Sequence, residues 1–189
     1  MINDLHTFIK NLVQLSVEEK HAMNSILNER LIKRKEHLIV EGEVCKKLWF
    51  FNHGLFRYYH TRADGAEITS DFVFAPYFAT SYTSLITGNP SFVNLQALED
   101  MKLLEFSKDD LNQLYNKYSG IERLGRKMAE LTVITSEKHL FFLLNQSAKQ
   151  RYTDLIRTYP EYLKSIPLQY IASYLGITQE TLSRIRKSI

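Results

Sequence analysis

The sequence is nearly without cysteine, since Cys45 is the only one among its 189 residues. A single cysteine cannot form an internal disulfide, and it excludes zinc and iron–sulfur sites that need several cysteines. We therefore expect a reducing compartment, the cytoplasm, as the location of the protein. No cofactor and no metal site are expected.

Long apolar runs are also missing. No stretch of about 18 apolar residues occurs, so we expect no membrane span and no membrane partner. The first six residues, Met1–His6, lack a basic flank followed by an apolar core, so a secretory signal is not expected either. No nucleophile–base pair, metal-ligand cluster or phosphate-binding loop stands out, and we do not expect an enzyme.

The chain has only a small excess of one charge sign, since its formal net charge is +3. This excess is unevenly distributed along the sequence. Residues 147–189 carry seven basic and three acidic side chains, a net charge of +4. Residues 1–146 carry 17 basic and 18 acidic side chains, a net charge of −1. A basic excess in the C-terminal fifth suits a polyanionic partner, although many solvated helices carry as much.

The N-terminal half changes from helical to strand-like composition. Ser16–Glu19 forms a capping box, and apolar residues at helical spacing follow it as far as Leu31. From about His37 to Phe106 the chain is rich in β-branched and aromatic residues, with turn signals such as Asp64-Gly65. This pattern predicts a small sandwich or barrel. The expected strands are residues 48–51, 55–59, 68–74, 93–97 and 102–106.

A long helix is predicted after this region. Ser107–Asp110 is a variant of the capping box and opens a first helix. Gly120–Asn145 then contains no proline and one interior glycine, Gly125. A helix of about 25 residues spans about 37 Å, longer than a small domain needs, and such helices commonly pair with a copy of themselves. We expect a homodimer; the alternative is a helix packed on its own β domain.

The C-terminal residues have the pattern of a helix-turn-helix. Ala172 supplies the small side chain that two closely crossing helices need, and Gly176 supplies the positive φ of the turn between them. Thr178 is a favourable N-cap for the second helix. Another capping box, Ser147–Gln150, begins the helix that precedes this pair. That helix is expected to end at Tyr159, because Pro160 cannot continue it. The alternative is a helical hairpin with a solvated polar face and no DNA partner.

The second helix presents side chains suited to double-stranded DNA. Glutamine can pair with adenine, arginine with guanine, and glutamate can accept from cytosine. Hydroxyl and basic side chains suit phosphates. The candidate DNA-binding residues are Thr178, Gln179, Glu180, Ser183, Arg184, Arg186 and Lys187.

At these residues the sequence resembles the Crp/Fnr family, the relatives of the catabolite activator protein. The resemblance is carried by Ile171-Ala172, Leu175–Thr178 and Glu180–Ile185. It implies an α+β fold with a cyclic-nucleotide-binding-like β jelly roll, a dimerisation helix and a helix-turn-helix. The corresponding domains are residues 1–119, 120–145 and 146–189. It also implies a dimeric transcription regulator with double-stranded DNA, RNA polymerase and a small-molecule effector as partners. Many members carry a β-hairpin wing after the recognition helix, and we expect none here.

The region matching the family's nucleotide site departs from its pattern. Cyclic-nucleotide binders of the family have a Gly-Glu element and, about ten residues later, an Arg-Ser pair, where Thr80-Ser81 and Ser91-Phe92 stand here. No arginine or lysine lies between Arg62 and Lys102, and burying a phosphate without a cation is costly.

We therefore expect an unknown effector that is not a cyclic nucleotide. The alternative is a regulatory protein whose DNA binding is switched by cyclic AMP or cyclic GMP. Aromatic residues in this region either line an effector pocket or simply fill the roll. The candidate effector pocket comprises Phe78, Thr80, Ser81, Tyr82, Ser91 and Phe92.

Overall fold

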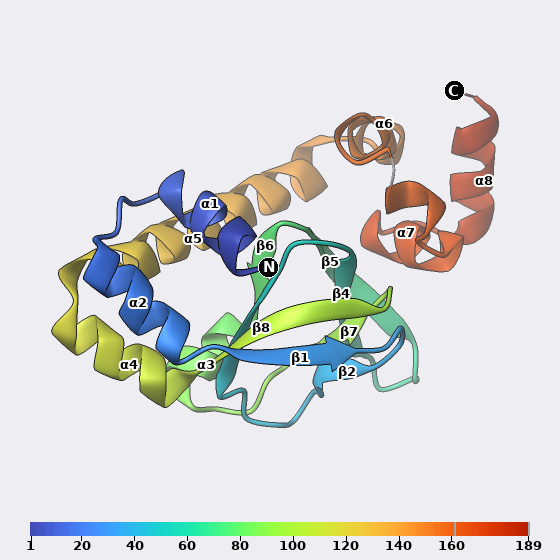
Figure 1. Ribbon diagram of the computed structural model, residues 1–189. Coiled ribbons are helices and arrows are strands. Elements are labelled where there is room, and N and C mark those ends of the chain that lie inside the picture. Colours follow the sequence, from blue (N-terminus) through green and yellow to red (C-terminus); the bar gives the residue numbers. More distant parts are fainter. Residues whose placement is uncertain (161, 189) are drawn as a thin grey trace.

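The computed structural model describes residues 1–160 and 162–188. Glu161 and Ile189, both within the predicted domain 146–189, lie outside the described residues. Over the described range, two antiparallel four-stranded sheets form a roll, with strand orders β1-β8-β3-β6 and β2-β7-β4-β5 (Figure 1). The strands are β1 (Asn28–Ile32), β2 (His37–Ile39), β3 (Lys47–Phe51), β4 (Leu55–Thr61), β5 (Glu67–Phe74), β6 (Tyr77–Ala79), β7 (Asn94–Ala97) and β8 (Met101–Ser107).

Helices flank the roll and continue beyond it. Figure 1 shows α1, α2 and α4 along the first part of α5, and α6, α7 and α8 gathered at its far end. The predicted α+β fold, with a jelly roll, a long helix and a helix-turn-helix, is confirmed. The helices are α1 (Ile2–Lys10), α2 (Val17–Ser25), α3 (Tyr82–Thr87), α4 (Lys108–Lys117), α5 (Ser119–Asn145), α6 (Ala148–Thr158), the 3-10 helix η1 (Tyr162–Lys164), α7 (Leu168–Tyr174) and α8 (Gln179–Lys187).

The helix that follows the first capping box is shorter than predicted. It ends at Ser25, and the chain then forms β1 instead of continuing as a helix through Leu31. Leu31 is 71% exposed and Ile32 is 1% exposed, the alternation expected of a strand. The pairing of β1 with β8 decides the outcome here, because strand formation depends on partners that local spacing does not reveal.

The five predicted strands all occur, with ends within two residues of those expected. The hairpin at Asp64-Gly65 is also confirmed: Gly65 has φ +83°, and Arg62 N–H donates to the Ala66 carbonyl at 2.9 Å. Within residues 37–106, three short elements were not predicted, β2, β6 and α3. Each is too short to give a clear periodic pattern.

The predicted helix starts agree with the capping contacts. Ser16 and Ser147 each form a capping box, with Glu19 and Gln150 as the respective third helical residues. Ser107 accepts a hydrogen bond from the Asp110 backbone at 3.1 Å and so caps α4. These contacts fix where α2, α4 and α6 begin, and hence where the chain enters and leaves the long helix α5.

Among the residues that the structure describes, three groups of buried side chains hold the elements together. One fills the interior of the roll, and a second joins one sheet to α1, α2, α4 and the start of α5. The third combines Leu55, Phe72 and Leu98 of the roll with Ile171 and Leu182 of the C-terminal helices. The C-terminal helices are therefore packed directly against the roll. In the described part of the chain, no helix is both long and apolar enough to cross a membrane.

Candidate DNA interface and effector region

The turn between α7 and α8 has the geometry that its sequence predicts. Ala172 is 2% exposed at the helix crossing, and its carbonyl accepts a hydrogen bond from Ile177 N–H at 3.0 Å. Gly176 has φ +67°, in the left-handed region. The Thr178 hydroxyl accepts a hydrogen bond from Thr181 N–H at 3.2 Å and so caps α8. The chain can therefore turn sharply and present α8 as a separate surface.

Replacing Gly176 with alanine tests the turn. A Cβ at this position would meet nothing within 4 Å, so the cost comes only from the left-handed backbone, about 1–2 kcal/mol of the free energy of unfolding. Gly42→Ala is the matched control, because Gly42 has φ +92° and equally open space but lies in the roll. Chemical denaturation should show a loss of stability in both variants. Only Gly176→Ala should also weaken DNA binding, and unchanged binding would contradict the importance of this turn.

All seven predicted DNA-binding side chains lie on the solvent side of the helix-turn-helix. Each is exposed, whereas Leu182 of the same helix is 1% exposed. The last turn of α8 carries Arg184, Arg186 and Lys187. At its first turn, hydrogen bonds from the Glu180 backbone and from Thr178 lower the pKa of the Glu180 carboxyl, so Glu180 is an ionised acceptor. The helix thus offers acceptors and donors on one open face.

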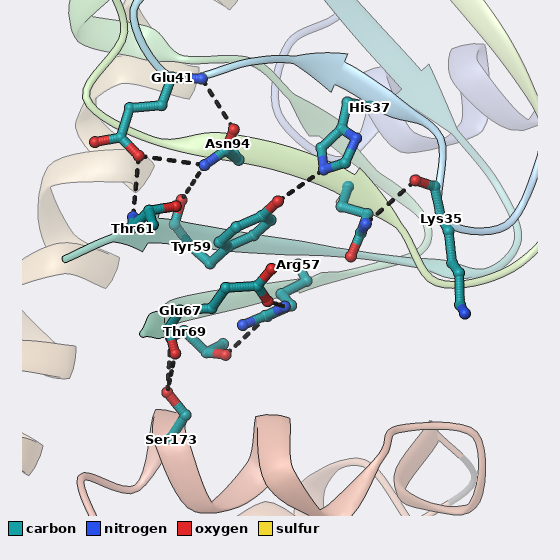
Figure 2. A network of polar contacts seen from close by, with 11 residues as sticks. Lys35, His37, Glu41, Arg57, Tyr59, Thr61, Glu67, Thr69, Asn94 and Ser173 are labelled. Carbon is teal, nitrogen blue, oxygen red and sulfur yellow. Dashed lines mark hydrogen bonds and ion pairs between the residues drawn. The ribbon is translucent and has the colours of Figure 1, made fainter. Parts of the chain in front are cut away.

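The C-terminal helices cover the open edge of a sheet. β5 is an edge strand of its sheet, with β4 on one side only. On its other side, the Ser173 hydroxyl of α7 accepts a hydrogen bond from Thr69 N–H at 2.8 Å and donates to the Glu67 carbonyl at 3.4 Å (Figure 2). Ser173 thereby satisfies two backbone groups that an edge strand leaves unpaired.

A buried arginine lies beside this edge. Arg57 is 1% exposed, and it donates to the Glu67 carboxylate at 2.6 Å and to the Thr69 hydroxyl at 2.8 Å (Figure 2). Its guanidinium lies 3.6 Å from the ring centroid of Tyr170 and 4.3 Å from that of Tyr59. Arg57 is thus held between an aromatic ring of the roll and one of α7, an arrangement that favours a cation over the ring faces.

Aromatic side chains extend the same contact. The rings of Phe74 and Tyr159 stack with centroids 3.9 Å apart, and those of Phe72 and Tyr174 lie 5.3 Å apart. This interface was not predicted from the sequence. Aromatic residues at alternate positions of an edge strand were its only signal, and they are equally typical of a strand covered by another sheet.

Ser173→Ala probes the attachment of the helix-turn-helix to the roll. The variant leaves Thr69 N–H without its partner, which should lower the free energy of unfolding by about 1–3 kcal/mol. Hydrogen exchange measured by NMR should show faster exchange at the Thr69 amide. Ser183→Ala, an exposed change on α8, should leave both quantities within experimental error. An unchanged Thr69 exchange rate in Ser173→Ala would show that this contact does not persist in solution.

The six residues predicted to form an effector pocket lie in three different environments. Ser81 and Ser91 are buried, with their hydroxyl oxygens 2.9 Å apart. Phe92 is 62% exposed. The remaining three, Phe78, Thr80 and Tyr82, line a cavity of about 460 Å³ between the roll and α5. Ser81 and Ser91, which stand where the resemblance would place charged side chains of a nucleotide site, are hydrogen-bonded to each other.

Within 1–160 and 162–188, no group of three or more histidine, cysteine, aspartate or glutamate side chains is placed to hold a metal ion. Cys45 is buried, and its sulfur lies 3.2 Å from the Lys47 carbonyl oxygen.

Comparisons with known proteins agree with this geometry. The family model described as "Cyclic nucleotide-binding domain" matches residues 29–118, from β1 to the end of α4. No curated protein matches the sequence.

Several solved structures share the fold. FixK2 from Bradyrhizobium japonicum gives a TM-score of 0.74 at 19% identity, over 86% of this chain and 84% of that one. A protein from Eubacterium rectale assigned to the crp/fnr family of transcriptional regulators gives 0.71 at 16% identity, over 92% and 83%. The catabolite activator protein of Thermus thermophilus gives 0.58 at 20% identity, over 92% and 83%. At these identities the likeness concerns the fold, which includes both the roll and the C-terminal helices.

Proposed function

We propose that this chain, which has the fold of the Crp/Fnr regulators and matches the cyclic nucleotide-binding domain model over residues 29–118, is a sequence-specific DNA-binding transcription regulator that acts as a homodimer. The observation that carries the proposal is the open face of α8. We assign residues 1–119 to the roll domain, 120–145 to the dimer helix and 146–189 to the DNA-binding domain. The protein is not proposed to be an enzyme.

The side chains of α8 divide into two roles. Gln179, Glu180 and Arg184 are proposed to read base edges in the major groove, because their amide, carboxylate and guanidinium groups match those edges. Positioning on the phosphates is assigned to the hydroxyl and basic side chains, which carry no sequence information themselves. The positioning residues are Thr178, Ser183, Arg186 and Lys187.

The dimer is proposed to form through α5. The side chains of this helix that line the cavity come from residues 121–136. Along its C-terminal half, the helix presents an apolar face of large side chains to solvent, which is the pattern of a helix that pairs with a copy of itself. These residues are Val133, Ile134, Leu140, Phe141 and Leu144.

Pairing along α5 would place two copies of α8 on one side of the assembly. The two copies would enter successive major grooves about 34 Å apart and read a palindromic site. RNA polymerase is the proposed further partner, and the cytoplasm the proposed compartment.

Switching by cyclic AMP or cyclic GMP is the second candidate, because the family model that matches the roll is that of a cyclic nucleotide-binding domain. The argument against nucleotide switching is that Ser81 and Ser91, which are hydrogen-bonded to each other, stand where cyclic-nucleotide binders of the family have charged side chains. Calorimetry with each nucleotide distinguishes the two. Micromolar binding would favour nucleotide switching, and no binding would favour another effector.

In-vitro selection from random duplex DNA, with purified protein and no added ligand, tests the proposed function. Enrichment of a palindrome is the expected result. If nothing is enriched, the selection is repeated with cyclic nucleotides and with cell extract. A chain that enriches no sequence under any of these conditions is not a sequence-specific regulator.

A further inference from the structure

The cavity beside α5 exists because the helix face toward the roll carries small side chains. Gly125, Ala129, Thr132 and Ser136 line it, at intervals of four, three and four residues that keep them on one side of the helix. A Cβ at Gly125 would already meet the Tyr115 side chain of α4, and larger side chains at the other three positions would reduce the space beside α5. The volume of about 460 Å³ is within the range of small-molecule sites.

The walls of the cavity are mostly apolar. Val73, Leu85, Phe106, Leu124 and Met128 contribute from the roll, from α3 and from α5. A ligand that fills this space must therefore present an apolar body, since burial of apolar surface is the favourable term available to it.

Two carboxylates interrupt the apolar wall, the exposed Glu122 and the half-buried Asp71. Asp71 of β5 lines the cavity, and its Oδ1 accepts a hydrogen bond from Phe72 N–H at 2.8 Å. Among the described residues, no donor is bonded to its Oδ2 and no cation lies within 4 Å of the carboxylate. Burial raises the pKa of Asp71, and the charge of His139 opposes that shift. The carboxylate is therefore half-buried at the cavity wall, and its Oδ2 remains open to a donor from a ligand.

The other ionisable groups at the cavity are already engaged or lie in solvent. Lys108 Nζ donates to the Ile86 carbonyl at 3.3 Å, and Arg126 pairs with Glu130. Glu122 is exposed. An anionic ligand head would meet Asp71 without a free cation beside it, whereas a cationic head would find an acceptor.

We propose that this cavity binds a small molecule with an apolar body and a protonated amino group, and that the amino group pairs with Asp71. This inference rests on the proposed function, because the ligand would act as the effector of the regulator. The amino group would make a charge-assisted hydrogen bond to the free oxygen of Asp71. The apolar body would lie between α5 and the strands.

The position of Asp71 connects this site to the DNA-binding helices. The next residue, Phe72, contacts Tyr174 of α7, and Thr69 on the same strand is bonded to Ser173. A ligand that shifts Asp71 therefore acts on the strand to which the helix-turn-helix is attached. Because the ligand and the DNA-binding unit share β5, saturating ligand should change DNA affinity.

Three probes of similar shape and different charge test the site on the full chain. They are 4-phenylbutylamine, 4-phenylbutanol and 4-phenylbutanoate, measured by calorimetry and by thermal unfolding at pH 7. The amine should bind at least tenfold more tightly than the alcohol or the acid and should raise the melting temperature.

Matched variants identify the group responsible. Asp71→Asn should reduce the preference for the amine to less than threefold, while Glu122→Gln, a change of the same kind at an exposed lining residue, should retain it. Ala129→Leu should weaken all three probes, because it fills the cavity. Circular dichroism verifies that each variant is folded.

Equal binding of the acid or the alcohol by the wild-type chain would overturn the proposal, as would absence of binding by all three probes. It would also be overturned if Asp71→Asn kept the preference for the amine. The selection experiment separates this failure from that of the proposed function. A palindrome enriched without ligand, together with no preference for the amine, would support the proposed DNA-binding function and exclude a cationic amine as the effector.

Discussion

Replacing Phe141 and Leu144 together with glutamate should give a folded monomer whose affinity for a palindromic site falls at least 100-fold. The two side chains are 65% and 75% exposed in the single chain, so their replacement removes no buried contact within it. In a dimer paired along α5 they would be buried, and two glutamates from each copy would place like charges opposite one another. Loss of the second half-site contact removes the gain that comes from linking two recognition helices.

Analytical ultracentrifugation and DNA titration measure the two parts of this prediction. Lys138→Glu is the control, because Lys138 is exposed on the same helix and lies off its apolar face. It introduces a glutamate without interrupting that face, and it should remain a dimer with nearly wild-type affinity. A double variant that stays dimeric would place the interface elsewhere.

Arg184→Ala should remove base preference at one position of each half-site, at a cost of about 1–3 kcal/mol. The reason is that a guanidinium can form two hydrogen bonds to a guanine edge, and alanine can form none. Arg184 is exposed in the free chain, so the variant should keep its stability. Selection from random duplexes should show a palindrome blurred at that base pair and unchanged elsewhere.

Arg186→Ala is the comparison for the loss of base preference expected in Arg184→Ala. If Arg186 contacts phosphate, its removal should weaken binding to all sequences equally and reduce the salt dependence of the affinity by about one unit of slope. Titrations at several salt concentrations distinguish the two arginines. An Arg184→Ala variant with unaltered base preference would exclude Arg184 from base reading.

Features governed by nearby residues were predictable from the sequence. Ser147 and Thr178 start helices through contacts three residues away, and Gly176 allows the turn through its own backbone. The long helix α5 was equally clear because nothing within it interrupts helical geometry.

Features governed by distant residues were not predictable. β1 was mistaken for helix because its partner, β8, lies at the other end of the roll in sequence. The attachment of α7 to β5 depends on pairs such as Arg57 with Tyr170, which no local spacing relates. The placement of Asp71 at the cavity likewise required the position of α5. The candidate effector residues were near one another in sequence, but in the bend before β7 Phe92 is exposed while Ser91 is buried.

The cover that α7 gives to β5 also limits how this chain can be divided. The roll, taken without the C-terminal helices, would present an unpaired strand edge beside the apolar side chains of Leu55 and Phe72. Such an edge is a template for association with other chains. The two parts are therefore not exchangeable modules, and a chimera that joins this roll to a foreign output domain must supply a new cap for β5.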